Sequence, residues 1–168
     1  LVENGKREGW YEKEITELES LFGCHGHTRV ASVYSMKWLT YSLTEFGMDD
    51  YSVDTVKHTV SYVLQEFKEI ADDAYAEFKK KYPEKALDDN DFYMVGEVYN
   101  YGISSGQEFD YGDRKVNYFD DAFDALINFE LKYNAREQGL DSIYTKYNNA
   151  LMTTFDDHGF VSDCYVKY

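Results

Sequence analysis

Two short apolar stretches of the chain each carry one carboxylate near the end. The first, Asp49–His58, has the β-branched, half-alternating pattern of a strand and contains Asp54. The second, Asp91–Val98, is an apolar run that contains Glu97. Such a pair can hydrolyse a glycosidic bond: one carboxylate attacks the anomeric carbon or stabilises its cation, and the protonated partner gives a proton to the leaving oxygen. Asp54 and Glu97 are therefore a candidate catalytic pair.

The neighbours of each carboxylate suggest its role. Lys57 follows Asp54 by three positions, and its charge would favour the ionised form that a nucleophile needs. Glu97 is flanked by apolar residues, which should raise its pKa and keep it protonated as an acid. Retaining enzymes hold the two carboxyl groups about 5–5.5 Å apart. Adjacent strands, about 4.8 Å apart, can supply that separation.

The elements around the pair predict a parallel α/β sheet. A long amphipathic helix is expected over residues 60–82 and is stopped by Pro83, the only proline. The two carboxylate strands are then successive strands of one sheet, whose active residues sit at the carboxyl ends. Other apolar patterns predict helices at 9–22, 34–46 and 140–152, a buried strand at 124–129, a cleft-building loop at 99–112, and the start of a last strand at 164–168.

Length and charge narrow the classes of function. The 168 residues amount to one domain without an internal linker, but a complete eight-stranded barrel needs roughly 250. Asp and Glu number 32 against 17 Lys and Arg, so the net charge of −15 argues against a nucleic-acid partner or an anionic membrane surface. No apolar run reaches about 18 residues, so no transmembrane helix is expected.

The motifs resemble one known family. Residues 51–58, Tyr-Ser-Val-Asp-Thr-Val-Lys-His, are similar to the nucleophile strand of the alpha-amylase family of glycoside hydrolases, and Val95–Val98 is similar to its acid/base strand. Residues 92–112 and 124–129 extend the likeness. The resemblance implies a partial (β/α)8 TIM barrel with about half of the barrel present, strands four to seven. It also implies a retaining hydrolase that cleaves α-glucosidic bonds in starch or maltooligosaccharides.

The resemblance also implies roles for single residues. Asp54 corresponds to the nucleophile and Glu97 to the general acid/base, while Lys57 and His58 contribute to the neighbouring substrate subsites. In many members the backbone carbonyl at the position of His58 helps to hold a structural calcium ion. The other ligands of that ion come from barrel parts that this chain lacks.

Two tyrosines after the second strand have two readings. Tyr99 and Tyr101 either stack on sugar rings as substrate-binding residues or cover the rim of the barrel. The Cys24-His25-Gly26-His27 turn offers zinc-type ligands, but it has no partner pair elsewhere, so a plain loop is favoured there.

Asp54 and Glu97 could also have purely structural roles. Asp54 could be a turn residue or an ion-pair partner of Lys57, and Glu97 could be a satisfied core carboxylate. Ser52 stands where the family has an arginine, and Asp50 adds a negative charge that should make Asp54 harder to ionise. The family's third carboxylate would fall beyond the end of the chain. These departures favour an inactive carbohydrate-binding or structural half barrel.

The resemblance and the fold suggest the partners and the compartment. The expected ligand is an α-glucan oligosaccharide or polysaccharide, and the family resemblance suggests a secreted or periplasmic protein. A half barrel leaves two unpaired sheet edges. We therefore expect self-association, or completion of the barrel by a missing half.

Overall fold

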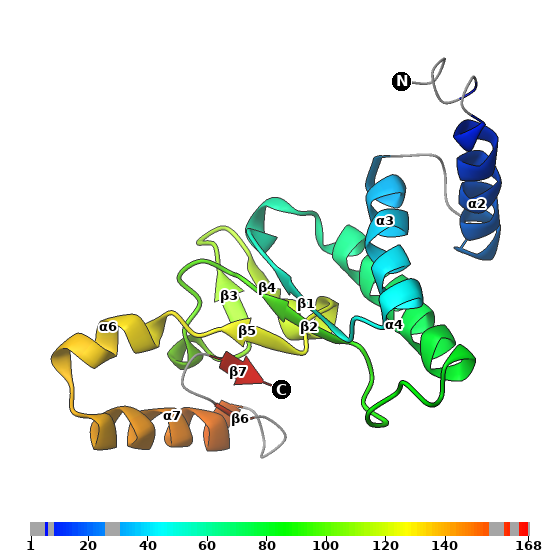
Figure 1. Ribbon diagram of the computed structural model, residues 1–168. Coiled ribbons are helices and arrows are strands. Elements are labelled where there is room, and N and C mark those ends of the chain that lie inside the picture. The colour runs from blue at the N-terminus through cyan, green and yellow to red at the C-terminus, as the bar shows by residue number, and fades with distance from the viewer. Residues whose placement is uncertain (1–5, 7–8, 26–30, 155–159, 162–164, 168) are drawn as a thin grey trace.

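The computed structural model describes residues 6, 9–25, 31–154, 160–161 and 165–167. Helices come first, and a mixed sheet follows (Figure 1). The helices are α2 Trp10–His25, α3 Ala31–Phe46, α4 Ser61–Lys81, α5 Tyr118–Asp121, α6 Glu130–Glu137 and α7 Leu140–Thr154, with 3₁₀ helices η1 Val56–His58 and η2 Ile103–Ser105. The strands are β1 Asp50–Val53, β2 Tyr93–Gly96, β3 Glu108–Asp110, β4 Lys115–Asn117, β5 Ala125–Ile127, β6 Phe160–Val161 and β7 Tyr165–Lys167.

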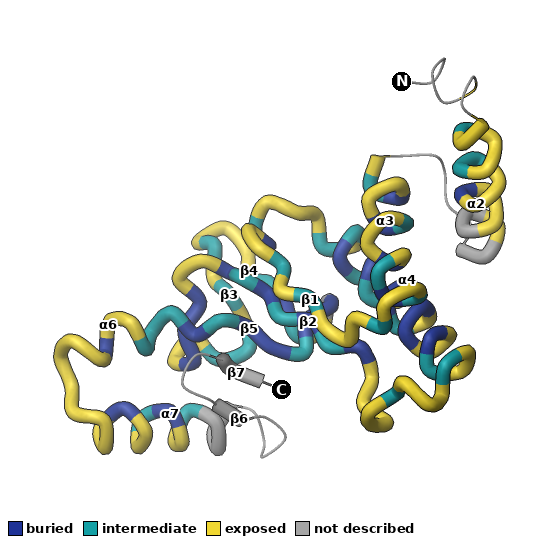
Figure 2. Tube along the Cα trace, viewed as in Figure 1, coloured by how far each residue is buried: buried dark blue, intermediate teal, exposed yellow. Residues whose placement is uncertain are grey.

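The core lies where helix α4 packs against α3 and the sheet (Figure 2). Apolar residues recur along α4 at three- and four-residue steps, which places one buried stripe on the helix. Met94 of β2 and Leu43 of α3 are fully buried in the same cluster. Helix α3 ends at Gly47, whose φ of 66° is the left-handed conformation that glycine accepts at a helix end. The predicted helices over 34–46 and 60–82 are confirmed.

Three strands of the five-stranded sheet run parallel, in the order β1, β2, β5. Val53 pairs with Gly96, and Gly96 pairs with Leu126, so the carboxyl ends of these strands lie at one edge of the sheet. Helix α4 connects β1 to β2, as the βαβ pattern predicted. The α/β class is therefore confirmed.

The half-barrel prediction is not confirmed, because the sheet is open and its last strands reverse. The order continues β5-β7-β6, and β7 runs antiparallel to both of its neighbours. Only residues 162–164 separate β6 from β7, and so short a connection can join only antiparallel strands. The last strand, expected to be parallel, also pairs antiparallel with β5.

Several further elements were not predicted. Residues 99–112, expected to form one loop, contain η2 and strand β3, which pairs with β4 as an antiparallel hairpin. Helix α6 follows β5 directly. The hairpin register joins Phe109 to Val116, with residues 111–114 as the turn. The connection from β2 to β5 thus carries a hairpin and a single turn of helix, where a complete barrel unit would have a long helix.

Candidate active site

Asp54 and Glu97 each lie one residue beyond the carboxyl end of their strands. The register that pairs Val53 with Gly96 brings the next two residues, Asp54 and Glu97, side by side. The Glu97 N–H donates to the carbonyl of Val53 at 2.8 Å, and the Val56 N–H donates to the carbonyl of Glu97 at 3.1 Å. Paired residues of neighbouring strands project to the same face. The backbone therefore aims both carboxyl groups into one space.

The two carboxyl groups lie close enough for Asp54 to raise the pKa of Glu97. A hydrogen bond to the side chain of Asp54 is the largest cause that raises the pKa of Glu97 above its ordinary value of 4.5; burial and the negative charge of Asp54 add to it. A hydrogen bond from the backbone of Thr55 opposes the increase. The predicted direction is confirmed, but the main cause is the facing carboxylate and not the apolar flanks. The facing side chain of Asp54 therefore favours the protonated form of Glu97.

This contact predicts a pH dependence of stability. Because the pKa of Glu97 is higher in the folded chain than in the unfolded chain, its contribution to stability is complete below about pH 4.5 and is lost as pH rises through the folded pKa. Gln at this position cannot titrate. The free energy of unfolding of the wild type minus that of Glu97→Gln should therefore fall with rising pH and then level off. Urea unfolding at a series of pH values measures it, and a difference that rises with pH would contradict the prediction.

Thr55 holds the turn after Asp54 in an unusual backbone conformation. Its φ and ψ are 52° and 40°, a left-handed conformation that a β-branched residue rarely adopts. Strain of this kind costs about 1–3 kcal/mol and gathers at functional sites. The turn directs Val56 into the core, where the side chain is 0% exposed. The strained turn is therefore anchored on both sides: by β1 before it and by a buried valine after it.

Relief of this strain is testable. Thr55→Gly should raise the free energy of unfolding by about 1 kcal/mol, since the strain removed exceeds the added backbone entropy of glycine. Asn100→Gly is the matched control: Asn100 has a φ of 68°, but asparagine tolerates the left-handed region. Chemical denaturation of the two variants should show a clear gain for the first and little change for the second. Equal effects would contradict a strained Thr55.

Lys57 does not contact Asp54, contrary to the expectation that its charge assists ionisation. Within the described ranges, no ion pair joins the Lys57 ammonium to a carboxylate. The Lys57 Nζ instead lies 3.9 Å from the centre of the Phe109 ring. Burial lowers the pKa of Lys57. The turn at Thr55 directs the two side chains apart: Asp54 faces Glu97, while Lys57 faces the β3–β4 hairpin.

His58 ends the 3₁₀ helix η1 and is exposed. The shallow depression beside it, about 450 Å³, is lined by Lys57 and Arg114 and by no carboxylate. Among the residues that the structure describes, no group of three or more His, Cys, Asp and Glu side chains could hold a metal ion. Calcium needs six to eight oxygen ligands, so these residues alone do not fit it. A calcium site at His58 stays a prediction that depends on ligands from outside the described residues. The side chains of the Cys24–His27 turn, considered above as zinc-type ligands, also lie outside the described part.

The two candidate sugar-stacking tyrosines have different environments. Tyr99 is 56% exposed, packs edge-to-face on Phe129, and lies 5.9 Å from the Lys57 Nζ. Tyr101 is 0% exposed, and its hydroxyl donates to the carbonyl of Gly106 at 2.8 Å. The prediction that Tyr101 binds substrate is therefore wrong for this structure, because no face of its ring reaches solvent. Tyr99 keeps a free surface near the carboxyl pair.

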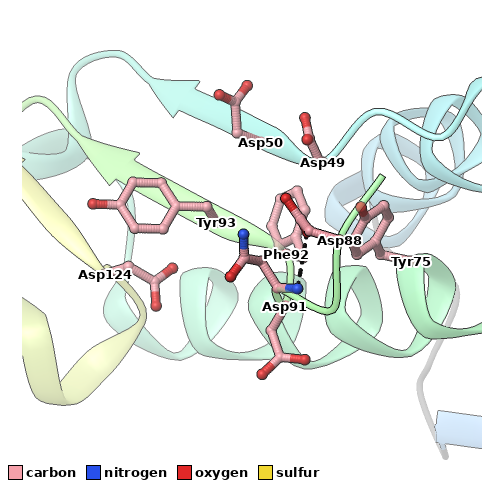
Figure 3. A pocket seen from close by; sticks show the side chains of 9 residues that line it. Asp49, Asp50, Tyr75, Asp88, Asp91, Phe92, Tyr93 and Asp124 are labelled. Atoms are coloured by element: carbon pink, nitrogen blue, oxygen red, sulfur yellow. Dashed lines mark hydrogen bonds between the residues drawn. The ribbon is translucent and has the colours of Figure 1, made fainter. Parts of the chain in front are cut away.

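Asp50 lies far from the carboxyl pair along its strand. It begins β1, at the opposite end of the strand from Asp54, and lines a separate pocket of about 480 Å³ at the amino ends of the strands (Figure 3). Asp49, Asp91 and Asp124 line the same pocket. Its charge is not among the causes that shift the pKa of Glu97. The strand itself keeps this acidic end away from the candidate site.

Sequence reasoning missed the hairpin that borders the site. Phe109 of β3 and Tyr111 just after it face Lys57 from the loop that had been expected to lack strands. A glycine-containing turn at Gly112, between short alternating segments, was the signal that could have revealed it. Asn128, 3% exposed, was also missed; its side-chain oxygen accepts from the Ile103 N–H, which ties the end of β5 to η2.

The chain is of the α/β class and carries two facing carboxyl groups at the ends of adjacent parallel strands, an arrangement that suits glycoside hydrolysis. The chain is 35% identical to the periplasmic alpha-amylase of Escherichia coli (strain K12) over 102 residues, which is 61% of this chain and 14% of that protein. The predicted resemblance to the alpha-amylase family is confirmed over this part of the chain. The chain spans about one seventh of the length of this relative.

Two other comparisons complete the picture. No family model matches the chain. The crystal structure of an Anoxybacillus alpha-amylase overlaps with 70% of this chain and 22% of its own length, at 20% identity and a TM-score of 0.49. No helix among the described residues is long and apolar enough to cross a membrane.

Proposed function

We propose that this chain carries the catalytic carboxyl pair of an alpha-amylase-type retaining glycoside hydrolase that cleaves α-glucosidic bonds in starch or maltooligosaccharides. Asp54 is the nucleophile and Glu97 the general acid/base. The observation that carries the proposal is the strand register that sets Asp54 and Glu97 side by side at the carboxyl ends of adjacent parallel strands, where Asp54 raises the pKa of Glu97. The likeness to a periplasmic alpha-amylase over 102 residues supports it.

The two carboxyl groups have different roles in the proposed mechanism. Glu97, whose pKa is raised, gives a proton to the glycosidic oxygen, while the carboxylate of Asp54 attacks the anomeric carbon. Glu97 then takes a proton from water, which hydrolyses the glycosyl-enzyme intermediate. A sugar must bind between the two groups, and the exposed side chain of Asp54 is free to turn aside.

The residues around the carboxyl pair suggest where a glucan would bind. The exposed ring of Tyr99 and the groups of Lys57 and His58 border the carboxyl ends and provide stacking and hydrogen-bonding surfaces for sugar rings. The relative is periplasmic by name, which supports the proposal that this protein works outside the cytoplasm. The outer edge of β1, unpaired within the described residues, is where a missing barrel half or a second copy would add.

A second candidate function is an inactive sugar-binding half barrel. Ser52 occupies the position where the family has an arginine, and no charged group of the described residues other than Asp54 is among the causes that shift the pKa of Glu97. A site without that guanidinium would lack the charge that keeps the nucleophile ionised.

Hydrolysis of a short maltooligosaccharide by the protein that carries this chain tests the proposal. Proton NMR of the first product should show the α-anomer, because a retaining enzyme preserves the anomeric configuration. Release of the β-anomer would overturn the retaining mechanism. Saturation-transfer signals from the sugar without any turnover would instead support the inactive binding function.

A further inference from the structure

The ammonium of Lys57 is surrounded by aromatic rings. Its Nζ lies 3.9 Å from the ring centre of Phe109, 5.8 Å from that of Tyr111 and 5.9 Å from that of Tyr99. A cation within about 6 Å of a ring face is attracted by the electron density of the ring. Rings from two segments, the hairpin and the stretch after β2, thus surround the ammonium of one lysine. This lysine follows Asp54 by only three residues.

The hairpin that supplies these rings is firmly held. Phe109 and Tyr111 pack edge-to-face with centres 5.1 Å apart. The Tyr111 hydroxyl shares a hydrogen bond with that of Tyr118, which is buried in the core. Arg114 lies over the Tyr111 ring at 4.6 Å. The rings are therefore in position before any ligand binds, and Lys57 has a defined place on them.

We propose that Phe109 is a positioning residue: its ring holds the Lys57 ammonium on the hairpin and so keeps this cation off the Asp54–Glu97 pair. The meaning of this arrangement rests on the proposed function, since a general acid must keep its proton. A lysine that swung back to Asp54 would neutralise the carboxylate that now raises the proton affinity of Glu97. The hairpin thereby separates a substrate-side cation from the acid and nucleophile.

The groups that surround the Asp54–Glu97 pair and Lys57 indicate what loss of the Phe109 ring would do. Glu97 faces the carboxylate of Asp54 and the backbone of Thr55. Lys57 faces Phe109, Tyr99 and Tyr111, with Arg114 beyond Tyr111, and burial alone lowers its pKa. Loss of the closest ring leaves the ammonium with two contacts near 6 Å. The carboxylate of Asp54, on the same turn, then becomes its anionic partner.

NMR titration of the folded chain tests this without any need for turnover. In Phe109→Leu, the Lys57 Hε signals should lose their upfield ring-current shift, and the midpoint of the Glu97 carboxyl titration should fall by about one pH unit, since an opposite charge within 4–6 Å shifts a pKa by about 1–3. Phe109→Tyr, which restores an aromatic ring, should keep both values near wild type. The same Phe109→Leu change in a Lys57→Met background should leave the Glu97 midpoint unchanged.

Two results would overturn the proposal. One is an unchanged Glu97 midpoint in Phe109→Leu although the Lys57 signals move; the other is an equal fall in the Lys57→Met background. If Phe109→Leu does not fold, the Lys57→Met variant alone tests the proposal. A Glu97 titration midpoint near that of the wild type supports a Lys57 ammonium held away from the carboxyl pair, and a rise of the midpoint by about one pH unit overturns the proposal. A wild type that titrates as described but does not hydrolyse glucan would overturn the proposed function and leave the positioning of Lys57 intact.

Discussion

Glu97→Gln is expected to lower the rate of α-glucan hydrolysis by about 10²–10⁴-fold, the usual contribution of a general acid. Glutamine keeps the size and a hydrogen bond to Asp54, but it has no proton to give to the leaving oxygen. A substrate with a good leaving group, such as a dinitrophenyl glycoside, needs little protonation. Its first step should therefore be slowed much less than that of a maltooligosaccharide.

The measurement is the rate of the first step, followed as pre-steady-state release of the leaving group from both substrates by wild type, Glu97→Gln and two comparison variants. Asp54→Asn should lose activity on both substrates, because it removes the nucleophile. Glu137→Gln changes an exposed glutamate of α6 and should behave as wild type. Equal losses of Glu97→Gln on both substrates would contradict an acid role, and full activity on the maltooligosaccharide would remove Glu97 from the mechanism.

Gly47→Ala is expected to lower the free energy of unfolding by about 2–5 kcal/mol. Gly47 has a φ of 66°, which costs a residue with a Cβ about 1–2 kcal/mol. A Cβ there would also lie 2.2 Å from the Cζ of Phe78. That ring is 5% exposed and packs on Tyr75 and Tyr82, so it has little room to move. Overpacking of this kind costs about 1–3 kcal/mol.

Gly112→Ala separates the two causes. Gly112 has a φ of 89°, but an added Cβ would meet nothing within 4 Å, so only the backbone cost applies. Urea denaturation should therefore show a loss for Gly47→Ala that exceeds the loss for Gly112→Ala by about 1–3 kcal/mol. Equal losses would mean that the Phe78 ring gives way without cost.

The periodic segments of the sequence were the most predictable part of the fold. Helices α3 and α4 follow apolar stripes with a glycine or proline at the end, and these local signals agree with the tertiary packing. The direction of β7 was not predictable in this way. The three residues of β7 are too few to show whether a partner strand is parallel or antiparallel, and the short connection accounts only for its antiparallel pairing with β6.

The candidate site likewise has a part that the sequence predicted and a part that it did not. Asp54 and Glu97 could be paired from sequence, because both follow strands joined by one helix, and parallel strands carry their side chains to a common edge. Contacts that depend on a distant segment could not be predicted. Lys57 was assigned to Asp54 by its closeness in sequence, yet the Phe109 ring lies against it. Tyr101 is buried because its hydroxyl finds the Gly106 carbonyl within the same loop.

The place of β1 in the sheet has a mechanical consequence. Glu97 extends a strand that is flanked on both sides, whereas Asp54 extends the outermost strand of the described sheet. Glu97 is therefore on the more rigid strand and Asp54 on the more compliant one. Under the proposed function, a sugar that separates the two groups should displace mainly β1, so any polypeptide that pairs with the outer side of β1 would limit that displacement.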